Sequence, residues 1–430
     1  MEKFFNFKDL NTNFKQEILG GIAAFAGMAY IIILIPKIME NVGFGAGASL
    51  VALCLMTFLS SLFIGLFAKV PFAAAPYLGE SAFIVWTLVE SMKIKPEEAL
   101  GVIFICGVIL LISTLLNVRP KLVNAIPKSL KFAFTIGLGM FLIYTGLTSI
   151  EFIKIENNMP SINNILNLHT IIALLSLLVI FVLGIKKNKC AILIGIGIAT
   201  ILGILFGDIE LPKNIFSTIP SISPIFMKLD IKSIFNLEFL PVVFIMLVVI
   251  FADTMGTTIT LASKANLLDK NGNFSSIKRV MLVDSISTTI APIMGTATVG
   301  TYAEGAVGIE AGAKSGLAPI ITGCLFLFTL FFAPLIGIIP PYAYGCALIA
   351  IGFSMVSLIK ELDFDDQTEY LPALFAILVM VLTKNLGIGM IFGFILHPVL
   401  KVAKDGFKAL NIANVVLFVI SILFLIFYPY

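Results

Sequence analysis

Apolar segments long enough to cross a lipid bilayer follow one another along nearly the whole of this chain of 430 residues. A transmembrane helix needs about 20 mostly apolar residues, so fourteen such helices use roughly 280–300 of them. Only 12% of the residues are charged, against about one quarter in a soluble domain. The sequence therefore predicts an all-α polytopic membrane protein with no separate soluble domain. The fourteen spans are expected at about 18–38, 49–68, 76–91, 98–117, 129–149, 169–186, 190–207, 240–262, 278–294, 303–313, 316–336, 342–359, 370–384 and 386–402.

Basic residues divide unevenly between alternate loops. With the N-terminus in the cytoplasm, 20 of the 28 Lys and Arg residues lie on the inner side, as the positive-inside rule expects. We therefore predict a multi-pass protein of the plasma (cytoplasmic) membrane, with residues 1–17 as a cytoplasmic N-terminus and no removable signal peptide. A further apolar stretch, 412–430, is either a fifteenth span or a helix lying in the membrane interface. Alternatively, 370–402 is one broken span and 412–430 is the fourteenth.

The two halves of the chain carry matching motifs in the same order. Glu80 in Gly-Glu-Ser-Ala-Phe corresponds to Glu304 in Ala-Glu-Gly-Ala-Val. Gly139 follows an Ile-Pro pair by twelve residues, and Gly352 follows a second Ile-Pro pair at the same distance. Since seven spans is an odd number, the second half must insert upside down relative to the first. Such a 7+7 inverted repeat is typical of transporters, whose substrate binds near the membrane midplane where the repeats meet.

Two predicted spans, 76–91 and 303–313, are short, and each follows a segment that disfavours a helix. Proline residues favour an extended backbone in Pro71–Gly79, and β-branched residues do so in Gly295–Tyr302. Extended backbone at membrane depth is tolerated only where protein or a polar cavity satisfies it. The sequence therefore predicts two half-helices, each preceded by a short extended segment. A glutamate falls in the first turn of each half-helix, where the helix dipole favours a negative charge.

Four acidic residues fall within predicted spans, namely Glu80, Asp253, Asp284 and Glu304. A charged side chain at the bilayer centre costs about 2.5–3.5 kcal/mol even on the most lenient scale, so a functional role is the default hypothesis. Each residue also has a structural alternative. Asp253 would bond to neighbouring hydroxyls, Glu80 and Glu304 would cap their helices, and Asp284 would serve helix packing rather than proton coupling.

Several classes of protein are disfavoured. The five cysteines are scattered, and their odd number and spacing indicate neither a disulfide framework nor a metal site. The net charge is +3 without a basic cluster that alternates with aromatic residues, so nucleic acid is not an expected partner. No nucleophile–base pair, phosphate-binding loop or haem motif is present. We therefore expect no enzyme activity, cofactor or metal, and structural roles for His169 and His397.

Five motifs together resemble one known family over nearly the whole chain. They are Gly20–Tyr30, Asn124–Leu130, Asp253–Thr257, Gly295–Glu304 and Asp363–Asp366. The chain resembles the nucleobase–cation symporters, and within them the azaguanine-type (AzgA-like) purine permeases, the branch of guanine, hypoxanthine and adenine permeases.

The resemblance implies a core domain of spans 1–4 and 8–11 and a gate domain of spans 5–7 and 12–14. These would be 18–117 and 236–336 for the core, and 118–235 (with the long outer loop) and 337–430 (with the C-terminal helix) for the gate. It also implies a homodimer in the lipid membrane that imports purines by proton symport, with an elevator-type motion of the core domain. In such proteins a carboxylate in span 8 and a glutamate opening span 10 hold the base, and these positions match Asp253 and Glu304.

Two departures from the family leave the purine open among adenine, guanine and hypoxanthine. Ser81 replaces an asparagine, with Glu80 in place of an apolar residue, and Ile250 replaces a second aspartate. Sodium coupling stays an alternative to protons, since threonines near Asp253 offer oxygen ligands, and so does an anion or other small-solute transporter of the same fold. The substrate-binding candidates are Asp253, Glu304, Glu80, Ser81, Thr257 and Thr301, and the proton-coupling candidates are Asp253, Glu304 and Asp284.

Overall fold

The computed structural model describes residues 2–117, 127–156, 159–212, 214–236, 239–269, 274–383, 385–407, 410 and 412–427. Residues 124–126 of the motif Asn124–Leu130 lie outside these ranges. The chain divides into two compact units. Unit 1 comprises Met1–Ala125 and Ser217–Ala333, and unit 2 comprises Ile126–Phe216 and Pro334–Tyr430.

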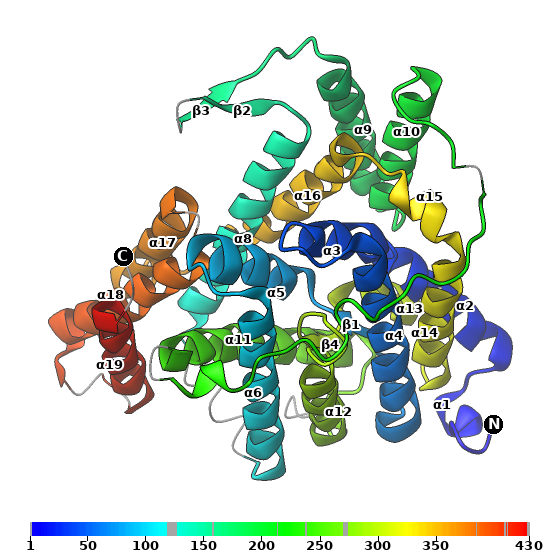
Figure 1. The fold of residues 1–430 in the computed structure, drawn as a ribbon. Helices are drawn as coiled ribbons and strands as arrows, with labels where there is room; N and C mark the ends of the chain where they lie inside the picture. The colour runs from blue at the N-terminus through cyan, green and yellow to red at the C-terminus, as the bar shows by residue number, and fades with distance from the viewer. Residues whose placement is uncertain are drawn as a thin grey trace. The chain divides into compact units, whose positions relative to one another are not determined.

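Unit 1 is a bundle of apolar helices around large buried side chains such as Met28, Phe72 and Phe83. In it, α14 packs against α2 and α4, and α6 packs against α11 and α12 (Figure 1). Its helices are α1 (Phe7–Leu10), α2 (Phe14–Met28), α3 (Ile31–Glu40), α4 (Ala46–Phe63), η1 (Ile64–Ala68), α5 (Leu78–Ala82), η2 (Phe83–Ser91), α6 (Pro96–Leu115), η3 (Ser233–Phe235), α11 (Leu240–Lys264), α12 (Ile277–Ile290), η5 (Ala303–Gly305), α13 (Ala306–Glu310), α14 (Leu317–Thr329) and η6 (Leu330–Phe332).

A two-stranded antiparallel sheet joins the two repeats inside unit 1. Strand β1 (Ala74–Pro76) pairs with β4 (Val299–Thr301) in the register Ala74↔Thr301, Ala75↔Gly300 and Pro76↔Val299. Hydroxyls on neighbouring helices bond to the strands: Ser61 accepts from the Ala74 N–H at 3.0 Å, and Thr288 donates to the Val299 carbonyl at 2.9 Å. Each strand leads into a short helix, so the two predicted half-helices with their extended segments are confirmed.

Unit 2 contains the remaining helices and a small hairpin. They are α8 (Lys128–Ser149), β2 (Ile153–Glu156), β3 (Met159–Ile162), α9 (Leu168–Ile185), α10 (Ala191–Leu205), α15 (Ala333–Gly337, which begins at the boundary of the units), α16 (Pro341–Val356), η7 (Ser357–Glu361), α17 (Gln367–Thr383), α18 (Leu386–Asp405) and α19 (Ile412–Phe427).

Helices α8 and α16 are the most closely packed pair of unit 2, and the glycines matched between the repeats lie at their contact. A Cβ atom on Gly139 would lie 2.8 Å from the Gly352 carbonyl oxygen, and one on Gly352 would lie 2.5 Å from the Gly139 carbonyl oxygen. Any side chain at either position would therefore push the two backbones apart. The sequence match thus has a physical basis, because the two positions contact each other.

All fourteen predicted spans coincide with a helix or with consecutive helices. Among the described residues, nine helical segments are long and apolar enough to cross a membrane. Helices α17 and α18 pack against each other, so 370–402 forms two helices and not one broken span. The first span differs in detail, since 18–38 was expected as one helix and the structure ends α2 at Met28 and begins α3 at Ile31.

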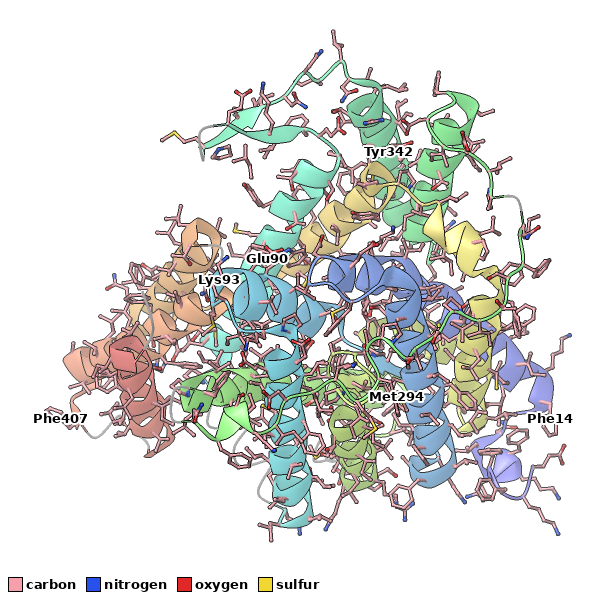
Figure 2. The ribbon with its side chains drawn as sticks, in the orientation of Figure 1. Phe14, Glu90, Lys93, Met294, Tyr342 and Phe407 are labelled. Atoms are coloured by element: carbon pink, nitrogen blue, oxygen red, sulfur yellow. The ribbon has the colours of Figure 1, made fainter. Side chains whose placement is uncertain are left out.

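Both histidines have carboxylate partners in unit 2. The His169 ring nitrogens lie 3.0 Å from Glu151 and 3.0 Å from Asp208, and Tyr342, labelled in Figure 2, donates to Asp208 at 2.8 Å. Hydrogen bonds from His169 and Tyr342 hold the pKa of Asp208 below its ordinary value. His397 lies 3.3 Å from Glu369. The first contacts link α9 and α16 to the segments that follow α8 and α10, and the second links α17 to α18, as structural histidines would.

Candidate functional site

The two half-helices begin beside each other because backbone pairing continues past the sheet. The Tyr77 N–H donates to the Thr298 carbonyl at 3.0 Å, and the Tyr302 N–H donates to the Ala73 carbonyl at 3.0 Å. Tyr77 and Tyr302 each immediately precede a half-helix, and their rings stack with centroids 5.9 Å apart and planes 20° apart. Both helix N-termini, whose first N–H groups have no partner in the regular hydrogen bonding of a helix, therefore open onto one region of unit 1.

Glu304, in the first turn of the second half-helix, is held by a tyrosine from another segment. The Tyr30 hydroxyl donates to Glu304 Oε1 at 2.6 Å. Tyr30 lies at the break between α2 and α3, and only 3% of it is exposed. Glu304 itself keeps part of its surface accessible. A charge-assisted bond of this kind fixes the carboxylate in one orientation while leaving it able to accept from a ligand.

Hydroxyl groups from α11 join this region to the sheet. Thr301 Oγ1 lies 2.9 Å from Thr258 Oγ1 and 3.3 Å from Thr257 Oγ1. The Tyr77 hydroxyl lies 3.2 Å from Thr257 Oγ1 and donates to the Thr301 carbonyl at 2.9 Å. The structure thus brings two predicted residues, Thr257 and Thr301, into one hydroxyl chain with Thr258 and Tyr77.

The remaining predicted acids also lie near Tyr77. Asp253, partly exposed on α11, lies within hydrogen-bonding range of the Glu80 carboxyl group and interacts electrostatically with Glu304. Asp284 on α12 lies beside Tyr77, since a Cβ atom on Gly300 would touch Asp284 Oδ1 and lie 2.5 Å from the Tyr77 hydroxyl oxygen. All four acids chosen from the sequence therefore belong to one region of unit 1.

Ser81 is fully buried, and its hydroxyl donates to the Tyr77 carbonyl at 2.8 Å within its own helix. This bond is local, so the geometry gives Ser81 a structural role, and its predicted contact with a substrate stays a prediction.

Three tyrosines of the site were missed in the sequence analysis: Tyr30, Tyr77 and Tyr302. Tyr77 and Tyr302 precede Glu80 and Glu304 by three and two residues, and this repeat-matched spacing was the signal that would have found them. Tyr30 ends the motif Gly20–Tyr30, but nothing in the sequence indicates that its hydroxyl reaches Glu304.

The site offers carboxylate acceptors, hydroxyls that both donate and accept, and helix N-termini, with no Lys or Arg among its residues. Such a set suits a neutral, planar molecule rich in N–H groups better than an anion. Within the described part of the chain, no group of three or more His, Cys, Asp or Glu residues has the geometry of a metal site.

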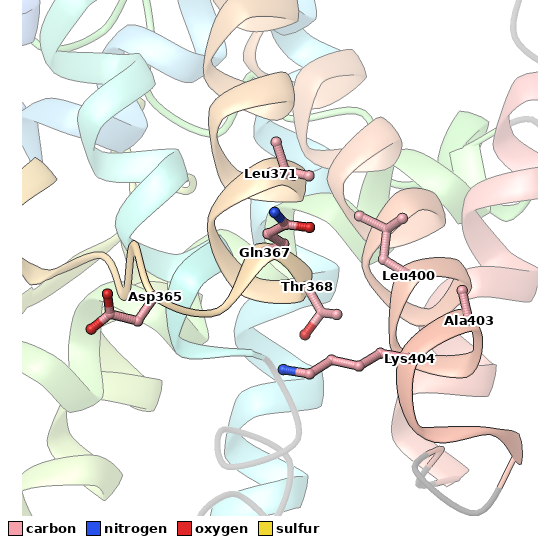
Figure 3. A pocket seen from close by; sticks show the side chains of 7 residues that line it. All are labelled: Asp365, Gln367, Thr368, Leu371, Leu400, Ala403 and Lys404. Atoms are coloured by element: carbon pink, nitrogen blue, oxygen red, sulfur yellow. The ribbon is translucent and has the colours of Figure 1, made fainter.

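A surface pocket of about 470 Å³ lies elsewhere, in unit 2 (Figure 3). It is lined by Asp365, Gln367, Thr368, Leu371, Leu400, Ala403 and Lys404. Lys404 pairs with Asp366 at 3.0 Å, and this bond is the main reason that the pKa of Asp366 lies below its ordinary value. None of the predicted site residues lines this pocket.

Comparison with known protein families decides the class of the protein. The sequence model described as "Permease family" (Xan_ur_permease) matches residues 15–396. The chain belongs to this permease family. The resemblance to nucleobase–cation symporters is thereby confirmed, and so is the expectation that the chain is not an enzyme.

The permease has relatives of the same length. It is 37% identical to a protein of Methanocaldococcus jannaschii named as a permease, over 96% of this chain and 94% of the relative. It is 31% identical to the adenine permease AdeP of Escherichia coli, over 99% and 96% of the two chains. It is 32% identical to the guanine/hypoxanthine permease PbuG of Bacillus subtilis, over 99% and 100%.

Solved structures share the fold of the permease at low sequence identity. The transmembrane domain of the cyanobacterial bicarbonate transporter BicA has a TM-score of 0.64 and 18% identity, covering 89% of this chain and 97% of that domain. SLC26A9 has a TM-score of 0.60 and 13% identity, covering 92% and 66%. The permease is thus a multi-pass membrane protein with the 7+7 inverted-repeat fold of these transporters.

Proposed function

We propose that this permease is a secondary active transporter that imports a purine nucleobase (adenine, guanine or hypoxanthine) together with a proton. The observation that carries the proposal is the carboxylate of the partly exposed Glu304, oriented by Tyr30 at the start of a half-helix, with no Lys or Arg among the site residues. Relatives about 30% identical over their full length are named adenine or guanine/hypoxanthine permeases.

A purine presents N–H donors and ring-nitrogen acceptors along one planar edge. Asp253 and Glu304 accept from the N–H groups, and the N–H groups of the half-helix N-termini donate to ring nitrogen or to an exocyclic oxygen. The Thr257 hydroxyl offers the purine an acceptor, because its proton goes to the Asp253 carbonyl at 3.0 Å, and the buried Thr301 hydroxyl holds Thr257 and Thr258 in place. A carboxylate site with no positive charge repels a small anion, so the anion alternative has less support.

Unit 1 contains every candidate site residue. Such an arrangement suits an elevator-type motion in which one domain, the core, carries the site while the other, the gate, stays fixed. We further propose that the protein is a homodimer of the plasma membrane with its N-terminus in the cytoplasm, where the basic residues are concentrated.

Uptake of radiolabelled adenine, guanine, hypoxanthine, xanthine and uracil by cells that lack their own permeases tests the substrate. We expect uptake of at least one purine, rising by up to about tenfold per unit fall in external pH where the proton is limiting, because one pH unit is worth about 1.4 kcal/mol per proton. A protonophore should abolish accumulation, and sodium should not be required.

Proteoliposomes with imposed gradients separate the alternatives. Uptake that follows a sodium gradient and does not respond to a pH gradient would overturn proton symport. Thr257 and Thr258 would then be the first residues to mutate, because their hydroxyls are candidate oxygen ligands of sodium. Uptake of bicarbonate with no purine uptake would overturn the purine assignment.

Tyr30→Phe is expected to raise the KM for the purine about tenfold or more. A hydrogen bond to a charged group contributes about 1.5–3 kcal/mol, and without it Glu304 loses its fixed orientation. Initial rates of uptake across purine concentrations measure the effect. Tyr370→Phe is the control, since that tyrosine lies on α17 in the other unit. An unchanged KM in Tyr30→Phe would mean that Tyr30 does not position Glu304.

A further inference from the structure

Glu80 and Asp284 are the two acids of the site that the proposed purine contacts do not use, and Glu80 is the more deeply buried of them. It is 0% exposed. Apart from its own backbone N–H, no donor among the described residues is in hydrogen-bonding geometry with either carboxylate oxygen. A buried ionised carboxylate without donors is very unfavourable, because neither water nor protein compensates its charge. The groups around Glu80 must therefore stabilise this carboxyl group in another way.

The groups that face Glu80 are themselves acidic or hydroxylic. From α11, Asp253 lies within hydrogen-bonding range of it. From α12, Asp284 interacts with it electrostatically, and Tyr77 and Tyr302 contribute phenols. None of these groups is a cation. Two carboxyl groups in contact repel each other when both are ionised, and they are stable together when they share one proton.

The two members of this pair differ in access. Asp253 keeps exposed surface, whereas Glu80 has none. A ligand from the aqueous side can therefore contact Asp253 but not Glu80.

We propose that Glu80 and Asp253 form an acid pair that holds one proton. Glu80 carries the transported proton behind the purine contact, and this proton binds before the purine and leaves after it. The inference rests on the proposed function. With the proton on Glu80, the Asp253 carboxylate is free to accept from a purine N–H. While the purine occupies Asp253, it blocks the route of the proton through this carboxyl group. Release of the purine reopens that route, and the O–H bond of Glu80 then breaks with transfer of its proton through Asp253 to water.

This order makes a kinetic prediction for the wild-type protein. Because the proton binds first, saturating purine draws the protein into the loaded state, so rising pH raises the KM for the purine while the maximal rate stays constant. Where Glu80 is mostly unprotonated before loading, the rise in KM approaches tenfold per pH unit, since each site must first take up one proton.

Glu80→Gln is the decisive variant, because glutamine resembles a permanently protonated Glu80. We expect it to exchange labelled purine across proteoliposome membranes without accumulating it against a gradient, with a KM that no longer changes with pH. Glu80→Asp, which restores a carboxyl group, should recover a pH-dependent KM, and it keeps the test decisive if the glutamine variant does not fold. Accumulation by Glu80→Gln with an unchanged pH dependence would overturn the proposal, and so would loss of the pH response in Asp284→Asn alone.

A spectroscopic measurement tests the pair without transport. Infrared spectra at neutral pH should show the C=O stretch of one protonated carboxyl group in the purified wild-type protein and in Asp284→Asn. The spectrum of Glu80→Gln should lack this band. A band retained in Glu80→Gln overturns the acid pair even if purine symport is correct. Conversely, a wild-type protein that shows the band but takes up no purine refutes the proposed function and, with it, the transport role of Glu80, while leaving the pair itself standing.

Discussion

Neutralising Glu304 or Asp253 is expected to lower purine uptake by about 30-fold or more, because removing one member of a buried charged hydrogen bond costs about 2–5 kcal/mol and each 1.4 kcal/mol is a factor of ten. In Glu304→Gln the amide keeps one acceptor, but its NH₂ group can face the N–H groups of the purine. Tyr30 still donates to the remaining oxygen, so the protein should fold. Asp253→Asn likewise replaces one acceptor oxygen on α11 with an NH₂ donor.

Uptake of labelled purine, normalised to the amount of protein in the membrane, measures both variants. Glu310→Gln is a matched control on the same half-helix, since Glu310 is 44% exposed and pairs with Lys264 at 3.0 Å, away from the site. We expect near-normal uptake for this control. Near-normal uptake by Glu304→Gln or Asp253→Asn would remove that residue from the purine contact.

Gly316→Ala is expected to destabilise the folded protein strongly. Gly316 precedes α14, and a Cβ atom there would strike the Gly65 carbonyl group, with the carbonyl carbon at 2.8 Å and Gly65 Cα at 2.9 Å. Both obstacles are backbone atoms that cannot rotate away. Its φ of −67° suits alanine, so the effect is purely steric. Overpacking of this kind costs about 1–3 kcal/mol and more when backbone must move.

The loss of stability is measured by the yield of protein after solubilisation in detergent, by its size-exclusion profile and by its melting temperature. Gly184→Ala on α9 is the control, because no atom lies within 4 Å of a Cβ atom built there. Its melting temperature should stay at or slightly above that of the wild type. Equal melting temperatures for the Gly316 and Gly184 variants would show that α14 and η1 can separate without loss of stability.

The spans and the half-helices could be predicted from the sequence because both depend on local properties. Apolar length alone decides where a helix crosses a bilayer, and the proline and β-branched residues before Glu80 and Glu304 locally disfavour helix. The intramembrane acids stood out for the same reason, since burial of charge is costly wherever it occurs.

What escaped prediction depends on where distant segments meet. The break between α2 and α3 falls at Ala29 and Tyr30, where no proline or glycine signals it in the sequence. Yet this break places the Tyr30 hydroxyl on Glu304. The stacking of Tyr77 on Tyr302 follows from the β1–β4 register, which no local pattern specifies. The Ser81 hydroxyl had two possible partners, a ligand or the carbonyl of its own helix, and only coordinates distinguish them.

The pairing of β1 with β4 also has a consequence for biosynthesis. Ala74 and its partner Thr301 lie in opposite halves of the chain, and at about 5–20 residues per second the ribosome makes the second strand roughly 10–45 s after the first. During that interval β1 has no strand to bond to. Ser61, made before it on α4, already both accepts from the Ala74 N–H and donates to the Ala74 carbonyl. The Ser61 hydroxyl can thus satisfy the Ala74 backbone groups of the nascent strand until the second half of the protein is synthesised.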